Sequence, residues 1–151
     1  MKTLLIVYHT GGVKTAQMAE AVARGAAGES DVRVVLKRCA DAGPEDVLAA
    51  DALVLGTPEN FGYMSGMMKD FLERIFYACE GKVNGRPWAL LVSAGQDGTG
   101  AIASVERIVA GLRLKRVREP ILALREITPE TLAQCEELGA TLAAGIAFGV
   151  F

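Results

Sequence analysis

Residues 4–15, which read Leu-Leu-Ile-Val-Tyr-His-Thr-Gly-Gly-Val-Lys-Thr, constrain the fold of this chain most strongly. Residues 4–8 are an unbroken apolar run without polar alternation, which is typical of a strand buried on both faces of a sheet. Small polar residues follow, and a helical pattern begins directly after them. A strand, a short polar loop and a helix N-terminus together form an anion site. The sequence therefore predicts a phosphate held by Thr10, Gly11, Gly12, Val13, Lys14 and Thr15.

The rest of the chain repeats this alternation of strand and helix. Apolar runs at 32–36, 52–55, 88–92 and 117–124 predict four further strands, and Pro120 favours an edge position for the last one. Apolar residues at helical spacing between the runs predict crossover helices, among them one over 64–79. Short apolar strands with helical crossovers predict an α/β domain, residues 1–151, with a parallel sheet covered on both faces.

Composition narrows the classes of function. Hydrophobic residues make up 51% of the chain, which argues for a packed core, and the net charge of −2 gives no support to nucleic-acid binding. No apolar run reaches the length of a membrane span, so no membrane partner is expected. The cysteines, Cys39, Cys79 and Cys135, are far apart and in no metal-ligand spacing. They predict buried, reduced thiols in a cytoplasmic protein.

Two further loops would lie at the same edge of the sheet as the first. The loop at 57–63 combines a rigid turn with two aromatic residues, Phe61 and Tyr63, either of which can stack on a flat ring. The loop at 93–100 is rich in glycine, which lets backbone approach a ligand closely. Ligands of open α/β sheets bind at the carboxyl ends of the strands. A phosphate on one loop and a ring between two others describe a mononucleotide such as FMN.

Three competing phosphate sites do not fit residues 4–15. A nucleoside-triphosphate loop needs GxxxxGK[ST], and here Lys14 and Thr15 are present without the leading glycine, with Val13 before them. The dinucleotide fingerprint GxGxxG is absent. A response regulator would need acidic residues after the first strand and an aspartate after the third, where Gly56 and Thr57 stand.

The chain resembles flavodoxin-like proteins, in particular the NAD(P)H-dependent FMN reductase and quinone reductase branch. Residues 8–15, 50–58 and 61–74 carry the resemblance. It implies a doubly wound five-stranded parallel sheet in the order 2-1-3-4-5, with FMN bound non-covalently at the strand ends. By analogy the first loop holds the phosphate, and the next two loops flank the isoalloxazine through Pro58, Glu59, Asn60, Phe61, Gly62, Ala94, Gly95, Gln96, Asp97 and Gly98. Thr57 and Ser93 are also expected to bind the cofactor.

The resemblance implies that NAD(P)H and a small electron acceptor, a quinone or flavin, are the partners. No Ser-His-Asp or Cys-His set is evident, so no catalytic residue is predicted, because the flavin carries the chemistry. Two other functions stay open: a flavodoxin-type electron carrier without its own substrate, and a fold relative with weak or lost FMN binding. The second rests on Val13 and Lys14, which replace the family's glycine and asparagine, and on the acidic Glu59. The oligomeric state also stays open, a homodimer included.

Overall fold

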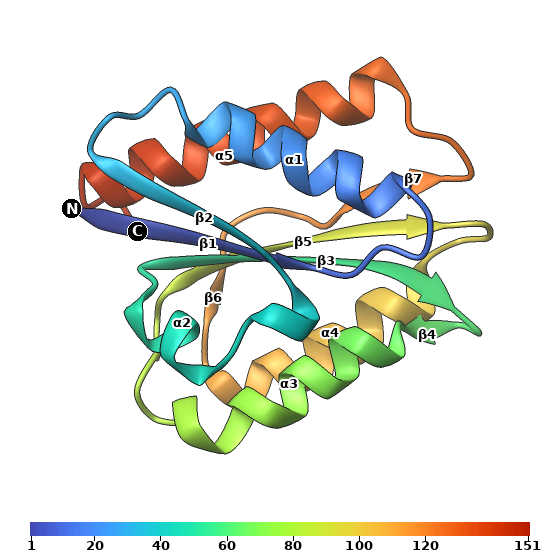
Figure 1. Cartoon of the computed structure of the whole chain (residues 1–151), viewed down its shortest axis with the longest axis horizontal. Helices are drawn as coiled ribbons and strands as arrows, with labels where there is room; N and C mark the ends of the chain where they lie inside the picture. The colour runs from blue at the N-terminus through green and yellow to red at the C-terminus, as the bar shows by residue number, and fades with distance from the viewer.

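The computed structural model describes all 151 residues and consists of a parallel sheet with helices on both faces, to which the short strand β4 adds an antiparallel pair (Figure 1). The strands are β1 (Lys2–Tyr8), β2 (Val32–Arg38), β3 (Ala52–Asn60), β4 (Tyr63–Met64), β5 (Pro87–Ala94), β6 (Lys115–Arg116) and β7 (Ile121–Leu124). The helices are α1 (Lys14–Ala26), α2 (Pro44–Ala49), α3 (Gly66–Cys79), α4 (Thr99–Leu112) and α5 (Pro129–Ala147), with a short 3-10 helix at Cys39–Asp41.

The strand order confirms the predicted topology. The main sheet runs β2-β1-β3-β5, and both β6 and β7 pair with β5 in parallel. Of the fifth strand predicted over 117–124, only 121–124 forms a strand, β7, and the separate short strand β6 precedes the predicted range and pairs with the other end of β5. Pro120 lies in the gap between them, where its missing N–H removes no ladder hydrogen bond. The order corresponds to the expected 2-1-3-4-5.

The alternation of side chains along β1 explains why its sequence is apolar without interruption. Leu4 and Ile6 pack into a cluster beneath α1 and α5, while Leu5 and Val7 pack into a second cluster beneath α2, α3 and α4. Figure 1 shows these two helical layers on opposite faces of the sheet. Since successive side chains of a strand point to opposite faces, a strand covered on both sides has no polar positions.

Glycine allows α1 and α5 to approach closely. A Cβ on Gly139 of α5 would overlap the carbonyl oxygen of Val22 in α1, and one on Gly25 would overlap the carbonyl of Glu136. Two glycines on facing helices therefore bring the backbones into contact. This contact fixes the position of α1 over the sheet, and α1 begins at the predicted phosphate loop.

Two helices begin at residues that favour a helix start. Thr128 caps α5 by accepting a hydrogen bond from the Thr131 N–H at 3.1 Å, and Pro129 opens the helix. Pro44 opens α2, as its fixed φ favours. The three cysteines are free and buried, as the sequence predicts, and burial raises the pKa of Cys39 and Cys135 to about 12.

The segment after the third strand differs from the prediction. Residues 57–60 were expected in a loop, but β3 continues to Asn60 and turns back into β4, with Asn60 opposite Tyr63. Met64 was expected in the following helix and instead lies in β4, because Ser65 caps α3 and starts the helix at Gly66. No helix of the structure has the length and apolar character that a membrane crossing requires.

Candidate functional site

The loops after β1, β3 and β5 converge at the carboxyl edge of the sheet, where the sequence predicts the ligand. They enclose a cavity of about 450 Å³, which reaches from the start of α1 to the ends of β3 and β5. A second cavity of about 520 Å³ continues past the β3–β4 hairpin to the start of α4. Glu59 and Gly95 line both cavities, which are therefore adjacent. Of the predicted site residues, all but Thr57 and Gly98 line one or the other.

Those two residues support the site from behind. Thr57 is fully buried, and its hydroxyl accepts a hydrogen bond from the Ser65 N–H at 3.0 Å and donates to the carbonyl of Pro58. Gly98 has a φ of +74° and caps α4, where a Cβ would meet the side chain of Leu122. Neither residue lines either cavity, and both hold the loops that do.

The first loop presents hydrogen-bond donors that the protein itself does not use. Val13 occupies the N-cap position of α1 and supplies no side-chain cap, so the N–H groups of the first turn have no partner within the helix. Gly11 and Gly12 are exposed, and a Cβ on either would meet nothing within 4 Å. The helix N-terminus therefore opens directly into the cavity, as anion sites require.

Two hydroxyl groups join the first loop to the end of β5. The Oγ1 of Thr15 and the Oγ of Ser93 lie 2.8 Å apart, and both side chains are buried. Each hydroxyl has one proton, and their mutual hydrogen bond uses one of the two. One proton stays available to a ligand. The hydroxyl of Thr10 donates to the carbonyl of Gly12 at 2.9 Å, so it shapes the loop rather than offering a free donor.

Arg125, which the sequence analysis did not select, belongs to the same edge. It follows β7 with a φ of +67°, and its N–H donates to the carbonyl of Ala94 at 2.7 Å. The ammonium of Lys14 donates to the carbonyl of Arg125, so it fastens the first loop to the loop after β7. The signal that could have found Arg125 was its place directly after the last predicted strand, at the edge shared by the other loops.

The β3–β4 hairpin presents an aromatic side chain on a tight turn. Its two central residues, Phe61 and Gly62, have φ values of +55° and +69°, as a two-residue hairpin turn of the I′ type requires. Phe61 is fully exposed and lines the second cavity. A bulky residue held at positive φ is uncommon and strained, and such residues concentrate at functional sites.

Glu59 does not point an unpaired charge at the cavity. Its carboxylate accepts hydrogen bonds from the N–H groups of Gly98, at 3.2 Å, and Ala101, at 3.1 Å. It therefore caps α4 from a neighbouring strand and holds the hairpin against the third loop. Asp97, in that third loop, binds both the N–H and the hydroxyl of Thr99, and these hydrogen bonds lower the pKa of its carboxyl.

His9 follows β1 at the same edge. Burial and the nearby Arg38 lower the pKa of its imidazole, so His9 is neutral at pH 7. Its backbone N–H donates to the carbonyl of Gly56 at 3.0 Å. This hydrogen bond joins the ends of β1 and β3.

The donors of the first loop fit a phosphate group. The free N–H groups of α1, the spare hydroxyl proton of Thr15 and Ser93, and the cation of Lys14 can all face an anion. The one carboxylate that lines this cavity, Glu59, is engaged by the N-terminus of α4. The second cavity lies next to the first and is lined by the exposed ring of Phe61 and by glycine backbone.

Comparison with known proteins agrees with this geometry. The family described as NADPH-dependent FMN reductase matches residues 40–128. The chain belongs to this family. The assignment confirms the predicted fold family and FMN as its flavin. The matched residues include the β3–β4 hairpin and the loop after β5, while the first loop lies before them.

Two curated relatives match part of the chain. A flavodoxin of Aquifex aeolicus is 37% identical, over 66% of this chain and 54% of the relative. An NAD(P)H dehydrogenase (quinone) of Acidithiobacillus ferrooxidans is 32% identical, over 62% of this chain and 57% of the relative. The chain thus spans about half the length of these curated relatives. A flavodoxin structure from the domain Archaea superposes with a TM-score of 0.84 at 23% identity, covering 96% of this chain and 99% of that one, which shows the shared fold.

Proposed function

We propose that this chain binds FMN at the carboxyl edge of its sheet and uses it to transfer electrons from NAD(P)H to a small acceptor such as a quinone. The observation that carries the proposal is the N-terminus of α1. It has no side-chain cap and faces a cavity next to the one that the exposed Phe61 ring lines. The family match and the quinone-reducing relative support the choice of reaction. The expected cytoplasmic location would give the protein access to NAD(P)H.

The residues divide into a phosphate end and a ring end. At the phosphate end the first-turn N–H groups of α1 and the hydroxyl pair of Thr15 and Ser93 bind the dianion, with Lys14 adding positive charge. At the ring end Phe61 and the backbone of the loop at 95–97, which line the second cavity, would hold the isoalloxazine. When bound, FMN would supply the hydride and electron transfer between nicotinamide and acceptor.

The protein's own contribution is to position and to desolvate. Phe61 would shield the ring from water, and the loop after β5, whose backbone lines both cavities, would contact the ring from its own side. The carboxylate of Glu59 is hydrogen-bonded to the N-terminus of α4, so no unpaired negative charge would lie beside a reduced flavin. No side chain is required as acid or base.

A visible absorption spectrum followed by anaerobic mixing with NADPH tests the proposal. We expect a yellow protein after reconstitution with FMN, and bleaching of its absorption within seconds of mixing. A protein that quenches no FMN fluorescence would overturn the binding site. A protein that binds FMN but bleaches only over many minutes would instead be an electron carrier, the function that the Aquifex flavodoxin suggests.

A further inference from the structure

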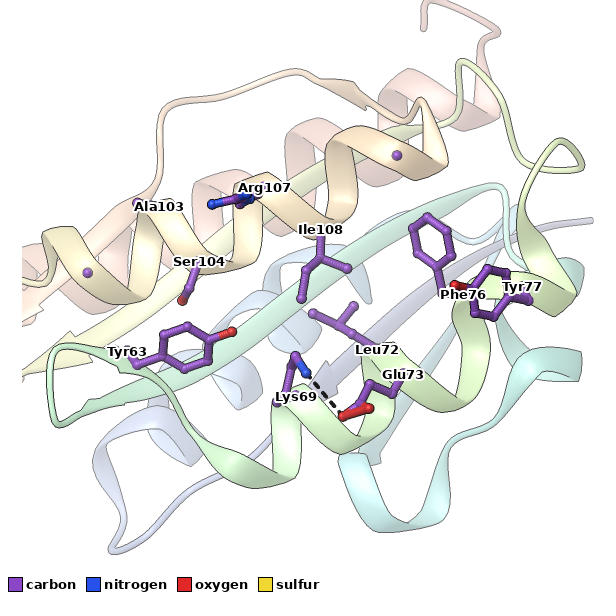
Figure 2. Close-up of a pocket in the computed structure, with 12 residues that line it drawn as sticks. Tyr63, Lys69, Leu72, Glu73, Phe76, Tyr77, Ala103, Ser104, Arg107 and Ile108 are labelled. Atoms are coloured by element: carbon purple, nitrogen blue, oxygen red, sulfur yellow. Dashed lines mark hydrogen bonds and ion pairs between the residues drawn. The ribbon is translucent and has the colours of Figure 1, made fainter.

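The largest cavity of the molecule is a groove between α3 and α4, outside the proposed flavin site. It measures about 780 Å³, which is within the range of small-molecule pockets. Figure 2 shows Tyr63 at one end and Phe76 and Tyr77 at the other. The residues lining it are Tyr63, Lys69, Leu72, Glu73, Phe76, Tyr77, Gly100, Ala103, Ser104, Arg107, Ile108 and Gly111.

The groove follows from the spacing of residues on its two helices. Leu72 and Phe76 of α3 lie one turn apart, and Ile108 of α4 faces them across the floor (Figure 2). Gly111 leaves room for the Phe76 ring, which a Cβ there would contact at 2.7 Å. The floor is therefore apolar and partly aromatic, which suits a flat hydrophobic molecule.

Charge in the groove is unbalanced. Lys69 pairs with Glu73 at 3.1 Å within α3, which neutralises both (Figure 2). Arg107, on the opposite wall, is exposed and makes no hydrogen bond or ion pair to the protein. Since these three are the only charged residues that line the groove, it has a net charge of one positive. An apolar floor with one unpaired guanidinium is complementary to an amphipathic anion.

The groove meets the ring end of the flavin site along one ridge. A Cβ on Gly100 would overlap the carbonyl oxygen of Gly62, so the hairpin turn lies directly on the first turn of α4. Gly100 lines both the groove and the second cavity, and Tyr63, which follows Gly62, lines the groove. A molecule in the groove can therefore extend over this ridge toward the ring site.

We propose that this groove binds the electron acceptor, and that the acceptor is a flat apolar molecule with an acidic group that Arg107 binds. This rests on the proposed function, which places the flavin beyond the ridge. Arg107 lies two turns after Gly100, about 10 Å along the helix at 1.5 Å per residue. The acidic group would accordingly lie about that far from the reacting end.

Binding of two anthraquinones tests the groove independently of electron transfer. Anthraquinone-2-sulfonate carries the acidic group, and 2-(hydroxymethyl)anthraquinone is its uncharged counterpart. Calorimetric titration of the full chain, with and without FMN, should give tighter binding of the sulfonate. Arg107→Gln should weaken the sulfonate about tenfold, as expected for one charge-assisted hydrogen bond, and remove most of the preference.

Two further variants make the titration decisive. Arg33→Gln removes an exposed arginine of β2 that also lacks a partner and lies outside the groove, and it should leave both affinities unchanged. Ala103→Trp, at an exposed lining position, should weaken both probes by filling the groove. Equal weakening of both probes by Arg107→Gln, or weakening of neither, would overturn the proposal.

Kinetic measurements then distinguish failure of the groove proposal from failure of the proposed function. In the FMN-loaded chain, Arg107→Gln should raise the KM for the sulfonate about tenfold with little change in kcat, since the residue acts on binding. If Arg107→Gln abolishes a preference for the sulfonate, but the FMN-loaded chain shows no NADPH-driven turnover, the groove proposal stands and the reductase proposal is refuted. Absence of probe binding together with a dimer in sedimentation analysis would assign the groove to a second copy of the chain and overturn the proposal.

Discussion

The N-termini of α1 and α4 lie at the same edge of the sheet and are treated in opposite ways. At α4 the carboxylate of Glu59 accepts from Gly98 and Ala101, so the helix start is occupied by the protein. At α1 the N-cap residue is Val13, and no side chain binds the first turn. Each of the other three helices also has a side chain, Asp46, Ser65 or Thr128, bonded at its start.

The difference shows where this fold retains unused binding capacity. A helix N-terminus carries positive potential and free donors whatever its sequence. The protein neutralises that potential with acid or hydroxyl groups at four helices and leaves it open at one. An open end costs stability, since a cap is worth about 1 kcal/mol. A ligand that accepts hydrogen bonds from the free N–H groups of α1 would restore this stability.

The largest expected effect comes from making α1 resemble α4. Val13→Asp places a carboxylate at the exposed N-cap of α1, where it binds the free N–H groups and repels a phosphate. We expect FMN affinity to fall on the order of 100-fold, because like charges about 4 Å apart cost up to roughly 4 kcal/mol near a protein surface. The flavin-free protein should at the same time gain about 1 kcal/mol of stability. Fluorescence titration with FMN and urea unfolding measure the two changes.

Val13→Asn is the matched control for charge. It offers the same cap without the carboxylate, so it should stabilise the flavin-free protein similarly and weaken FMN much less. Undiminished FMN affinity in Val13→Asp would place the phosphate away from α1.

The next effect comes from removing the cap of α4. Glu59→Ala should lower the free energy of unfolding by about 1–2 kcal/mol, since two N–H groups lose a charged acceptor. Glu59→Gln keeps one acceptor oxygen and should lose less. Urea unfolding of the flavin-free variants gives both numbers, and equal stability of all three proteins would show that the contact contributes nothing.

A smaller effect is expected at the hydroxyl pair beneath the first loop. Thr15→Val retains the shape of the side chain but removes the hydroxyl that bonds Ser93. Because Thr15 lies in the first turn of α1, we expect its hydroxyl to accept from Ser93 and to donate to the phosphate. FMN should then bind about tenfold more weakly, as for the loss of one hydrogen bond to a charged group worth about 1.5 kcal/mol. Thr141→Val removes a hydroxyl of α5 that bonds Arg118, and it should leave FMN binding unaltered. Comparable affinity in the two variants would exclude the hydroxyl pair from the phosphate site.

The smallest effect concerns the acid sensitivity of the α4 end. Bonds from Thr99 lower the pKa of Asp97 in the folded protein below the ordinary 3.8. The folded carboxyl therefore contributes stability above the unfolded pKa, and this is lost as pH falls through the folded value. Asp97→Asn should be less stable than the wild type near neutral pH, and the gap should narrow below about pH 4. Urea midpoints from pH 6 to pH 3 follow the gap, and a constant gap would contradict the linkage.

The sequence predicted the parts of the molecule that depend on local pattern. The apolar run of β1 and the edge position of the segment with Pro120 follow from rules that act over a few residues. The convergence of the three loops followed from the topology of parallel sheets, because their carboxyl ends share an edge.

The features that escaped prediction depend on distant partners or on strained backbone. Glu59 was expected as an awkward charge near the flavin, because the N–H groups that bind it belong to Gly98 and Ala101, far along the chain. The hairpin escaped because a turn with Phe61 at positive φ lacks the usual Asn-Gly or Asp-Gly signal. Arg125 likewise shows its place only once the loop after β7 is folded against Ala94.

The contact between Gly62 and Gly100 has a consequence for the rates of binding. With Glu59 it fastens the hairpin to α4 at two points, so Phe61 is carried on a support that is ordered before any ligand arrives. The entropy of ordering that turn is lost during folding rather than during association. Binding at this end of the site should then proceed without a slow conformational step, and substitutions there should act mainly on the dissociation rate.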